Sequence, residues 1–279
     1  ILVGGVAAEP DGTLWVTNRA AVDPLHVRTP DGEWTGLSGL DCEGLTMSGV
    51  TFDRLTIDSF GQKWIIVLDR FQLRRVLGVA VLDTRDTPAD ASDDACRFFG
   101  TKGSGGQDLP ATEVTSVVED RDGTIWIGTT GGLAFVINSG VVADDRSAVP
   151  VWPQFADRSE GTFLLFGAVV NDLAVDPANG IWVATQQGLH LTDPATGRVR
   201  TYRPQPGDPS SLSHDNVTHL YRDRTGTVWV ATWGGGFCRV RPASPFVGVD
   251  AERGGLSHDF IMAFAEDSTG VVWVGTGGG

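Results

Sequence analysis

A phrase centred on tryptophan recurs along this 279-residue chain and limits its possible folds more than any other feature. Each clear copy has an aspartate six residues before the tryptophan and a glycine three residues before it. The clear copies occupy residues 120–129, 223–232 and 267–276. Looser copies surround Trp15, Trp64 and Trp182, so six tryptophans share one frame at spacings of 44–62 residues. A repeat of roughly this length, rich in β-forming residues, is typical of the blades of a β-propeller.

One repeat predicts four antiparallel strands. Residues 217–222 alternate in polarity, and the tight turn at residues 223–226 precedes an apolar, β-branched run at residues 227–232. Three glycines then lead to a third strand at residues 237–240. The preceding repeat supplies an outer fourth strand at residues 198–202, after an Asp-Pro-Ala-Thr-Gly turn. Four such strands make one blade.

The fold class is therefore all-β, a β-propeller of four-stranded antiparallel blades that is seven-bladed when complete. We expect about five and a half blades here, in a single domain over residues 1–279, truncated at its C-terminus and also at its N-terminus. Residues 83–110 and 142–161 interrupt the period and have little strand character, so they predict long loops that are disordered or decorative.

The repeated aspartate and tryptophan are interpreted as scaffold rather than site. Aspartate at the first place of a turn bonds its own backbone, so Asp223→Ala is expected to cost about 1 kcal/mol. The tryptophan lies in an apolar strand, which predicts that Trp126, Trp182 and Trp229 are largely buried. A helix longer than two turns between residues 114 and 136 would contradict the repeat.

Composition excludes some partners. The net charge is −14 with no basic stripe, which makes nucleic acid a poor partner. Cys238 lies in a predicted strand, whereas Cys42 and Cys96 lie in predicted loops and would pair only in an oxidising compartment. The sequence contains no motif for a metal, a cofactor or a catalytic group, so we predict none of them.

Two phrases carry a resemblance to a known family. Residues 209–217 read Pro-Ser-Ser-Leu-Ser-His-Asp-Asn-Val and precede the repeat at Trp229, and residues 254–259 read Gly-Gly-Leu-Ser-His-Asp before Trp273. With those repeats, the chain resembles the two-component regulator propeller family. The likeness is specific around Trp126, Trp229 and Trp273 and looser in the other three repeats.

The resemblance implies a non-catalytic sensor propeller in the periplasmic or extracellular part of an inner-membrane protein. It also implies an adjacent β-sandwich, a membrane helix and a histidine kinase or diguanylate cyclase output domain in the same chain, and a homodimer of the full-length protein.

Two alternatives stay open. One is a metal-dependent enzyme related to the lactonase and streptogramin-lyase propellers, since residues 176–184 fit either pattern. His214 and His258 recur in the inter-blade phrase, however, which favours a structural role over a catalytic one. The other alternative is a propeller that serves only as an interaction scaffold.

A ligand is expected on the loops that follow the second strand of each blade, because residues that vary at a repeat-equivalent loop position escape the packing constraint. Trp233 is the strongest candidate, since glycines follow it and an exposed aromatic ring favours binding. Arg19, Arg70 and Gln186 occupy corresponding loops and would contact a hydroxyl-rich or carboxylated ligand, either a small molecule or an oligosaccharide. We predict that all four lie on one face.

Overall fold

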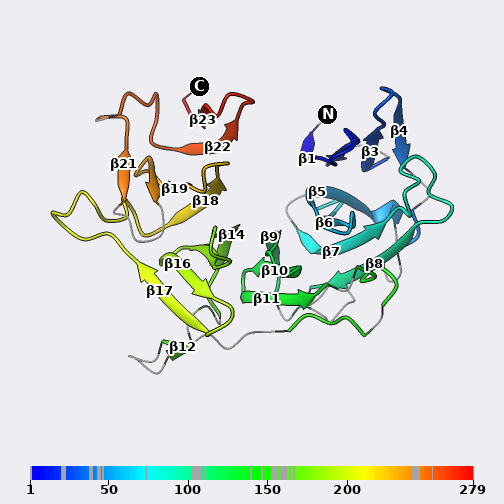
Figure 1. Ribbon diagram of the computed structural model, residues 1–279, viewed down its shortest axis with the longest axis horizontal. Helices are drawn as coiled ribbons and strands as arrows, with labels where there is room; N and C mark the ends of the chain where they lie inside the picture. Colours follow the sequence, from blue (N-terminus) through cyan, green and yellow to red (C-terminus); the bar gives the residue numbers. More distant parts are fainter. Residues whose placement is uncertain are drawn as a thin grey trace. The chain divides into compact units, whose positions relative to one another are not determined.

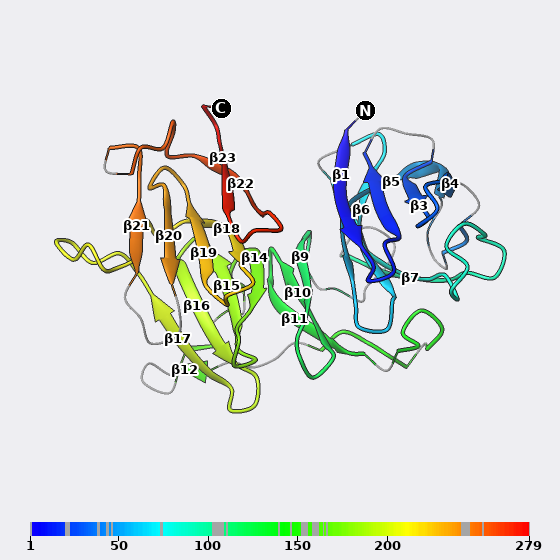
Figure 2. The same cartoon turned by 45° about the horizontal axis from the view of Figure 1, so that its top comes forward.

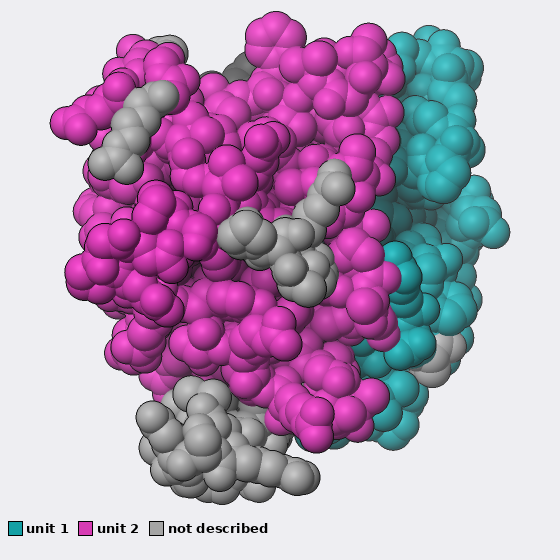
Figure 3. All heavy atoms as spheres, turned by 60° about the vertical axis from the view of Figure 1, so that its left-hand side comes forward, with its two compact units in different colours: residues 1–152 teal, residues 153–279 magenta. Residues whose placement is uncertain are grey.

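The regular secondary structure of the computed structural model is almost entirely β-strand, and the chain divides into two compact units, residues 1–152 and 153–279 (Figure 3). The structure describes residues 2–19, 23–37, 40–42, 45, 47–72, 75–101, 109, 111–138, 140–145, 147–151, 156–157, 162–163, 165, 167–240, 246–252 and 254–278. Among these, η1 (Met47–Gly49) is the only helix, a single 3₁₀ turn.

The first unit holds three consecutive antiparallel sheets. The first has the strand order β1 (Val3–Ala8), β2 (Leu14–Asn18), β3 (Leu25–Arg28) and β4 (Trp34–Leu37). The second has β5 (Val50–Ile57), β6 (Lys63–Asp69), β7 (Val76–Asp83) and β8 (Ala95–Gly100). The third has β9 (Val114–Glu119), β10 (Thr124–Thr129) and β11 (Gly132–Ile137) (Figure 1).

The second unit repeats this plan. One sheet contains β14 (Val170–Val175), β15 (Ile181–Thr185), β16 (Gly188–Asp193) and β17 (Arg198–Tyr202). The next contains β18 (Val217–Arg222), β19 (Val228–Thr232), β20 (Phe237–Val240) and β21 (Val247–Val249), which lie side by side in Figure 2. A two-stranded sheet follows, β22 (Ile261–Glu266) and β23 (Val272–Thr276), and a short hairpin pairs β12 (Ala156–Asp157) with β13 (Thr162–Phe163).

The six tryptophans occupy equivalent places, as the repeat predicts. Each lies in the second strand of its sheet and pairs with a residue of the first strand, and the pairs are Trp15 with Ala7, Trp64 with Thr56, Trp126 with Val118, Trp182 with Ala174, Trp229 with Tyr221, and Trp273 with Ala265. Strands β9, β10 and β11 fill residues 114–137, so the prediction that this segment holds no helix is confirmed.

The apolar core lies between successive sheets of a unit. One cluster packs the first sheet on the second around Trp15, a second packs the second on the third around Trp64, and a third packs β14–β17 on β18–β21 around Trp182. Each of these three tryptophans has a relative exposure of 0%, and Trp126 has 3%. Burial of a large ring against the next blade removes much apolar surface from water, which explains why tryptophan recurs at this position.

The prediction that Trp229 is largely buried is wrong. Trp229 is only partly buried, and Trp273 is 64% exposed. The reason is that the sheet packed against Trp229 has two strands, and the ring meets Phe264 of that sheet at a centroid distance of 6.1 Å. Trp15, Trp64 and Trp182, each followed within its unit by a sheet of three or four strands, are fully buried, whereas Trp229, followed by a two-stranded sheet, is not.

Two expectations about strands were wrong in part. Residues 83–110 contain a strand, β8, which completes the second sheet and buries Phe98 and Phe99 against its neighbours. The third sheet has three strands rather than four, although Val151 forms an isolated bridge with Phe135 of β11. Residues 102–108 and 158–161 lie outside the described residues, so the expectation of disorder there stays a prediction.

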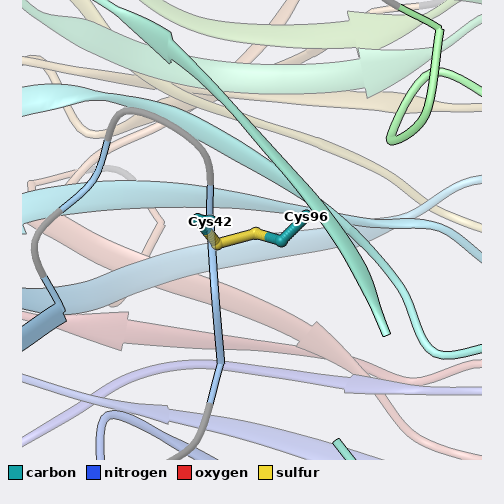
Figure 4. The surroundings of a disulfide bond; sticks show 2 residues. All are labelled: Cys42 and Cys96. Carbon is teal, nitrogen blue, oxygen red and sulfur yellow. A yellow bond between two sulfur atoms is a disulfide. The ribbon is translucent and has the colours of Figure 1, made fainter. Parts of the chain in front are cut away.

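Cys42 and Cys96 form a disulfide that joins the segment after β4 to β8 across 54 residues (Figure 4). Cys238 stays free and buried in β20, and burial raises the pKa of its thiol. The sequence left the pairing of Cys42 and Cys96 open, because both lie outside the repeated phrase.

Within the described part of the chain, no helix has the length and apolar character that a membrane crossing requires.

Candidate ligand-binding site

The repeated aspartate has two separate tasks. In the turn before β19, the Oδ1 atom of Asp223 accepts the backbone N–H groups of Thr225 and Thr227, both at 2.9 Å, while its Oδ2 atom accepts the indole Nε1–H of Trp229 at 2.9 Å. Burial alone would raise the pKa of Asp223, but these hydrogen bonds outweigh it and lower the pKa below its usual value. The aspartate is therefore more than the local turn-former that the sequence predicts.

The same carboxylate–indole bond recurs in five of the six repeats. The acceptors are Glu9 for Trp15 at 2.6 Å, Asp58 for Trp64 at 2.9 Å, Asp120 for Trp126 at 2.8 Å, Asp223 for Trp229 at 2.9 Å and Asp267 for Trp273 at 3.0 Å. These carboxylates are thus engaged by the scaffold. Among the described residues, no group of three or more His, Cys, Asp or Glu side chains has an arrangement that could hold a metal ion.

At the opposite end of the second strand, the next loop residue has the same backbone position in five repeats. Its N–H donates to the carbonyl of the residue just before, or near, the start of the first strand. The donor–acceptor pairs are Arg19 to Leu2 at 2.8 Å, Arg70 to Gly49 at 2.9 Å, Thr130 to Glu113 at 3.1 Å, Trp233 to Asn216 at 2.9 Å and Gly277 to Phe260 at 2.8 Å. Gln186 follows Thr185 in the same frame. We call these six residues the post-strand position.

The backbone of the post-strand position is therefore fixed while its side chain varies from glycine to tryptophan. The loop behind it is also held, because Thr129, Thr185 and Thr232 donate their hydroxyl groups to the carbonyls of Gly132, Gly188 and Gly236. A rigid scaffold that presents variable side chains on loops is the usual design of a binding face.

Trp233 has the largest side chain at this position, and 54% of its surface is exposed. The ring packs edge-to-face on Phe260, with 4.3 Å between ring centroids, and the two residues also form an isolated backbone bridge. Contact with Phe260 leaves the ring oriented but accessible, as the sequence predicts for a ligand platform. Whether it binds a ligand stays a prediction.

The other three candidate residues differ in their exposure and in the contacts that hold them. Gln186 is exposed. Arg70 is half-buried, and its loop backbone is tied to Gly49. Arg19 is also half-buried, and its Nε and Nη2 atoms donate to Oδ1 of Asp53 at 2.9 and 2.5 Å, which ties the first sheet to the second. This ion pair gives Arg19 a structural task that the sequence does not reveal.

Arg19 and Arg70 belong to the first unit, and Gln186 and Trp233 belong to the second. The expectation that all four share one face concerns the arrangement of the two units and stays a prediction.

An open groove of about 1080 Å³ lies in the second unit, and Gly234 and Gly235, which follow Trp233 in sequence, line it whereas Trp233 does not. Its walls come from the segment before β18, from the loop after β19 and from the segment around β21 and β22. They include Asp215, Asp259 and the glycines that follow Trp233, Gly234 and Gly235. The groove thus adjoins the glycine loop that follows Trp233.

Sequence reasoning missed an exposed aromatic residue beside the post-strand position, Phe71. It follows the post-strand residue Arg70, and 82% of its surface is exposed. Asp69 holds this loop, since its Oδ1 accepts the N–H groups of Phe71 at 2.8 Å and Gln72 at 3.0 Å. An aspartate two residues before an aromatic residue in a turn was the available signal.

The recurring histidines act on the backbone. The Nδ1 atom of His214 accepts the N–H of Asn216 at 3.0 Å, and that of His258 accepts the N–H of Phe260 at 2.9 Å. Each ring therefore holds the segment that leads into the first strand of its sheet, which agrees with the structural interpretation of both residues.

Comparison with known proteins identifies the repeats. Residues 108–131, 211–234 and 255–278 match the family described as two component regulator propeller. No curated protein matches the chain in sequence.

Solved structures share the fold at low sequence identity. PorZ, a surface component of the type-IX secretion system of Porphyromonas gingivalis, aligns with a TM-score of 0.68 and 21% identity over 99% of this chain and 39% of PorZ. Virginiamycin B lyase from Staphylococcus aureus aligns with 0.65 and 11% over 99% of this chain and 78% of the lyase.

The extracellular domain of BT3049 from B. thetaiotaomicron, described as a hybrid two component system, aligns with a TM-score of 0.63 and 20% identity over 98% of this chain and 31% of that one. This chain therefore spans well under half the length of PorZ and of the BT3049 domain. Its sheets are the blades of a β-propeller, and the repeats at Trp126, Trp229 and Trp273 match the two component regulator propeller family.

Proposed function

We propose that this chain is the ligand-binding sensor propeller of a membrane-anchored signal-transduction protein, and that its ligand contacts the post-strand loops. The observation that best supports this proposal is the geometry of the post-strand position. Five repeats hold this backbone with one hydrogen bond, yet the side chains differ, and Trp233 places an exposed ring there. The contact with Phe260 covers only part of the Trp233 ring, and ligand stacking would use the exposed part.

The match of three repeats to the two component regulator propeller family supports the sensor role, as does the likeness to BT3049, which is described as a hybrid two component system. The disulfide supports a periplasmic or extracellular location, because disulfides persist in oxidising compartments. A histidine kinase or diguanylate cyclase elsewhere in the same protein would then carry the output. Reading the gene beyond residue 279 tests this part. A β-sandwich, one membrane helix and an output domain should follow, whereas a secretion signal upstream and an end within a blade or two would refute the proposal.

A thermal-shift screen of neutral and carboxylated mono- and oligosaccharides tests the site. At a ligand concentration of about 100 times its dissociation constant, binding stabilises the folded protein by about 2.7 kcal/mol, which is readily measured. Hits should be lost in Trp233→Ala and kept in Trp34→Ala. Trp34 is the matched control, since it is also 54% exposed but lies on β4 of the first unit. Hits that survive in both variants would place binding elsewhere.

A second candidate function is a lyase-type enzyme, since virginiamycin B lyase shares the fold with a TM-score of 0.65. Calorimetric titration with Ca²⁺ or Mg²⁺ separates the two. A tight stoichiometric site would favour the enzyme, because hard cations require several oxygen ligands.

A further inference from the structure

At two interfaces, neighbouring sheets are clamped at their turn ends by a glutamate. The residue before the repeated aspartate reaches back to the turn of the preceding sheet. In the first unit, Glu119 accepts the backbone N–H of Ser59 at 2.6 Å and its hydroxyl at 2.7 Å. In the second unit, Glu266 accepts the backbone N–H of Arg224 at 3.0 Å and pairs with its guanidinium at 3.1 Å. The donor follows the aspartate of its own sheet in both cases. The first and second sheets have Pro10 and Ile57 at the corresponding positions and are joined instead by the Arg19–Asp53 pair.

Between the sheets β14–β17 and β18–β21, neither of the two positions that form this clamp holds a suitable residue. The donor position holds Pro177, which has no amide hydrogen, and the acceptor position holds Arg222, which has no acceptor atom. The two turns meet instead by van der Waals contact. A Cβ atom built on Gly226 would lie 2.8 Å from Cγ of Pro177.

The β14–β15 turn also lacks the bond that joins aspartate and tryptophan in the other five repeats. The Oδ2 atom of Asp176 and the Nε1 atom of Trp182 are buried and have no hydrogen-bond partner, although the two residues are only 2% and 0% exposed. Asn179 occupies the left-handed place, with φ of 70°, where the other five repeats have glycine. A buried donor and a buried acceptor without partners leave this turn less well determined than its equivalents.

The opposite end of the same interface is well tied. The side-chain amide of Asn171 donates to the Val217 carbonyl at 2.6 Å, and Oδ2 of Asp172 accepts the Leu220 N–H at 3.0 Å. These ties hold the first strand of the next sheet, beside the carbonyl of Asn216 that fixes Trp233. The interface is therefore hydrogen-bonded near the start of β14 and lacks the glutamate clamp at the Asp176 turn.

We propose that the contact between the sheets β14–β17 and β18–β21 is the movable joint of the second unit. The Asp176 turn swings against the Asp223 turn about the Asn171 and Asp172 bonds. A ligand on the Trp233 loop, which the proposed function requires, would bias this swing through β18. Interfaces that have two packing arrangements are the elements that convert ligand binding into a change of shape.

Amide hydrogen exchange of the unliganded chain tests the joint. Amides of residues 178–183 should exchange at least about tenfold faster than those of residues 60–65, 122–127 and 225–230. Equal protection of the four turns would overturn the proposal.

Restoration of the glutamate clamp provides a second test of the joint. The double variant Pro177→Ser/Arg222→Glu recreates the Ser59–Glu119 arrangement and should slow exchange at residues 178–183 about tenfold. Each single change is a matched control, since Pro177→Ser supplies a donor without an acceptor and Arg222→Glu supplies the reverse. A slowing that either single variant reproduces in full would contradict the clamp.

A cysteine pair keeps the test independent of the clamp. The Cβ position of Gly226 lies 3.7 Å from Cβ of Pro177, within the range of about 3.5–4.5 Å that a disulfide requires. Oxidised Pro177→Cys/Gly226→Cys should slow exchange at residues 178–183 relative to the reduced form, in which any strain at Gly226 is the same. Equal exchange in the two forms would overturn the joint. Binding at Trp233 is measured separately, so a failed joint is distinguishable from a failed sensor.

Discussion

The carboxylate of Glu119 holds Ser59 by two hydrogen bonds, one to the backbone N–H at 2.6 Å and one to the hydroxyl at 2.7 Å. Glu119 ends β9, and Ser59 lies in the turn between β5 and β6, so the pair joins two consecutive sheets through residues that are 60 positions apart. The same relationship joins Glu266 to Arg224. The repeat thus encodes contacts between blades as well as the fold of each blade.

Glu119→Ala should lower the free energy of unfolding by about 1 kcal/mol, the usual net value of such hydrogen bonds when they are partly exposed. Urea unfolding measures the change. Arg222→Ala is the control at the same repeat position, and it should stay within about 0.5 kcal/mol of the wild type. Equal losses would mean that Glu119 acts through something other than the clamp.

Asp120→Ala should cost about 2–3 kcal/mol, because it leaves the turn amides of Asp122 and Thr124 and the indole N–H of Trp126 without an acceptor. Asp176→Ala should cost about half as much, since Asp176 bonds the Ala178 amide but not Trp182. Paired urea titrations compare the two. A larger loss of stability for Asp176→Ala would contradict the inference that the Asp176 turn is less well determined than its equivalents.

His190 makes stability depend on pH. Burial, with a smaller contribution from Arg203, lowers the pKa of this histidine from 6.5 to about 4. The unfolded chain therefore binds the proton more readily, so stability is full above about pH 6.5 and falls as the pH drops toward about 4. Between pH 7 and 4.5 the wild type should lose about 2 kcal/mol more than His190→Gln, at up to 1.4 kcal/mol per unit. Parallel losses in urea unfolding would mean that another group titrates.

Removal of the disulfide should destabilise the first unit. The bond closes a loop across 54 residues, and Cys42→Ala/Cys96→Ala should lose about 2–4 kcal/mol. Cys238→Ala, which removes a buried free thiol, serves as the control for loss of a sulfur atom and should cost less. Thermal unfolding that is unchanged by the double substitution would show that the bond does not form.

The strands could be predicted because turn-forming residues mark the strand ends within each repeat. The predicted strands at residues 198–202 and 237–240 coincide with β17 and β20. Strand β8 was missed because it lies outside the tryptophan phrase and follows a run of turn-forming residues. Periodicity within one sequence identifies the strands that all repeats share, whereas an outer strand depends on its own neighbours.

The site could be predicted only as a position. The variable residue after the second strand is visible in the sequence, and the structure gives Trp233 an exposed ring there. The ion pair of Arg19 with Asp53 and the exposure of Phe71 depend on contacts between different loops. Such contacts leave no trace in the spacing of a single repeat.

Calorimetric titration with the saccharide that emerges from the thermal-shift screen tests the central claim most directly, using wild type, Trp233→Ala and Trp34→Ala. Loss of a stacking aromatic ring at a binding centre costs 2 kcal/mol or more, so Trp233→Ala should weaken binding by at least about 30-fold. Its melting temperature should change little, because the ring is half-exposed. Trp34→Ala should bind as the wild type does. Unchanged affinity in Trp233→Ala would contradict the account.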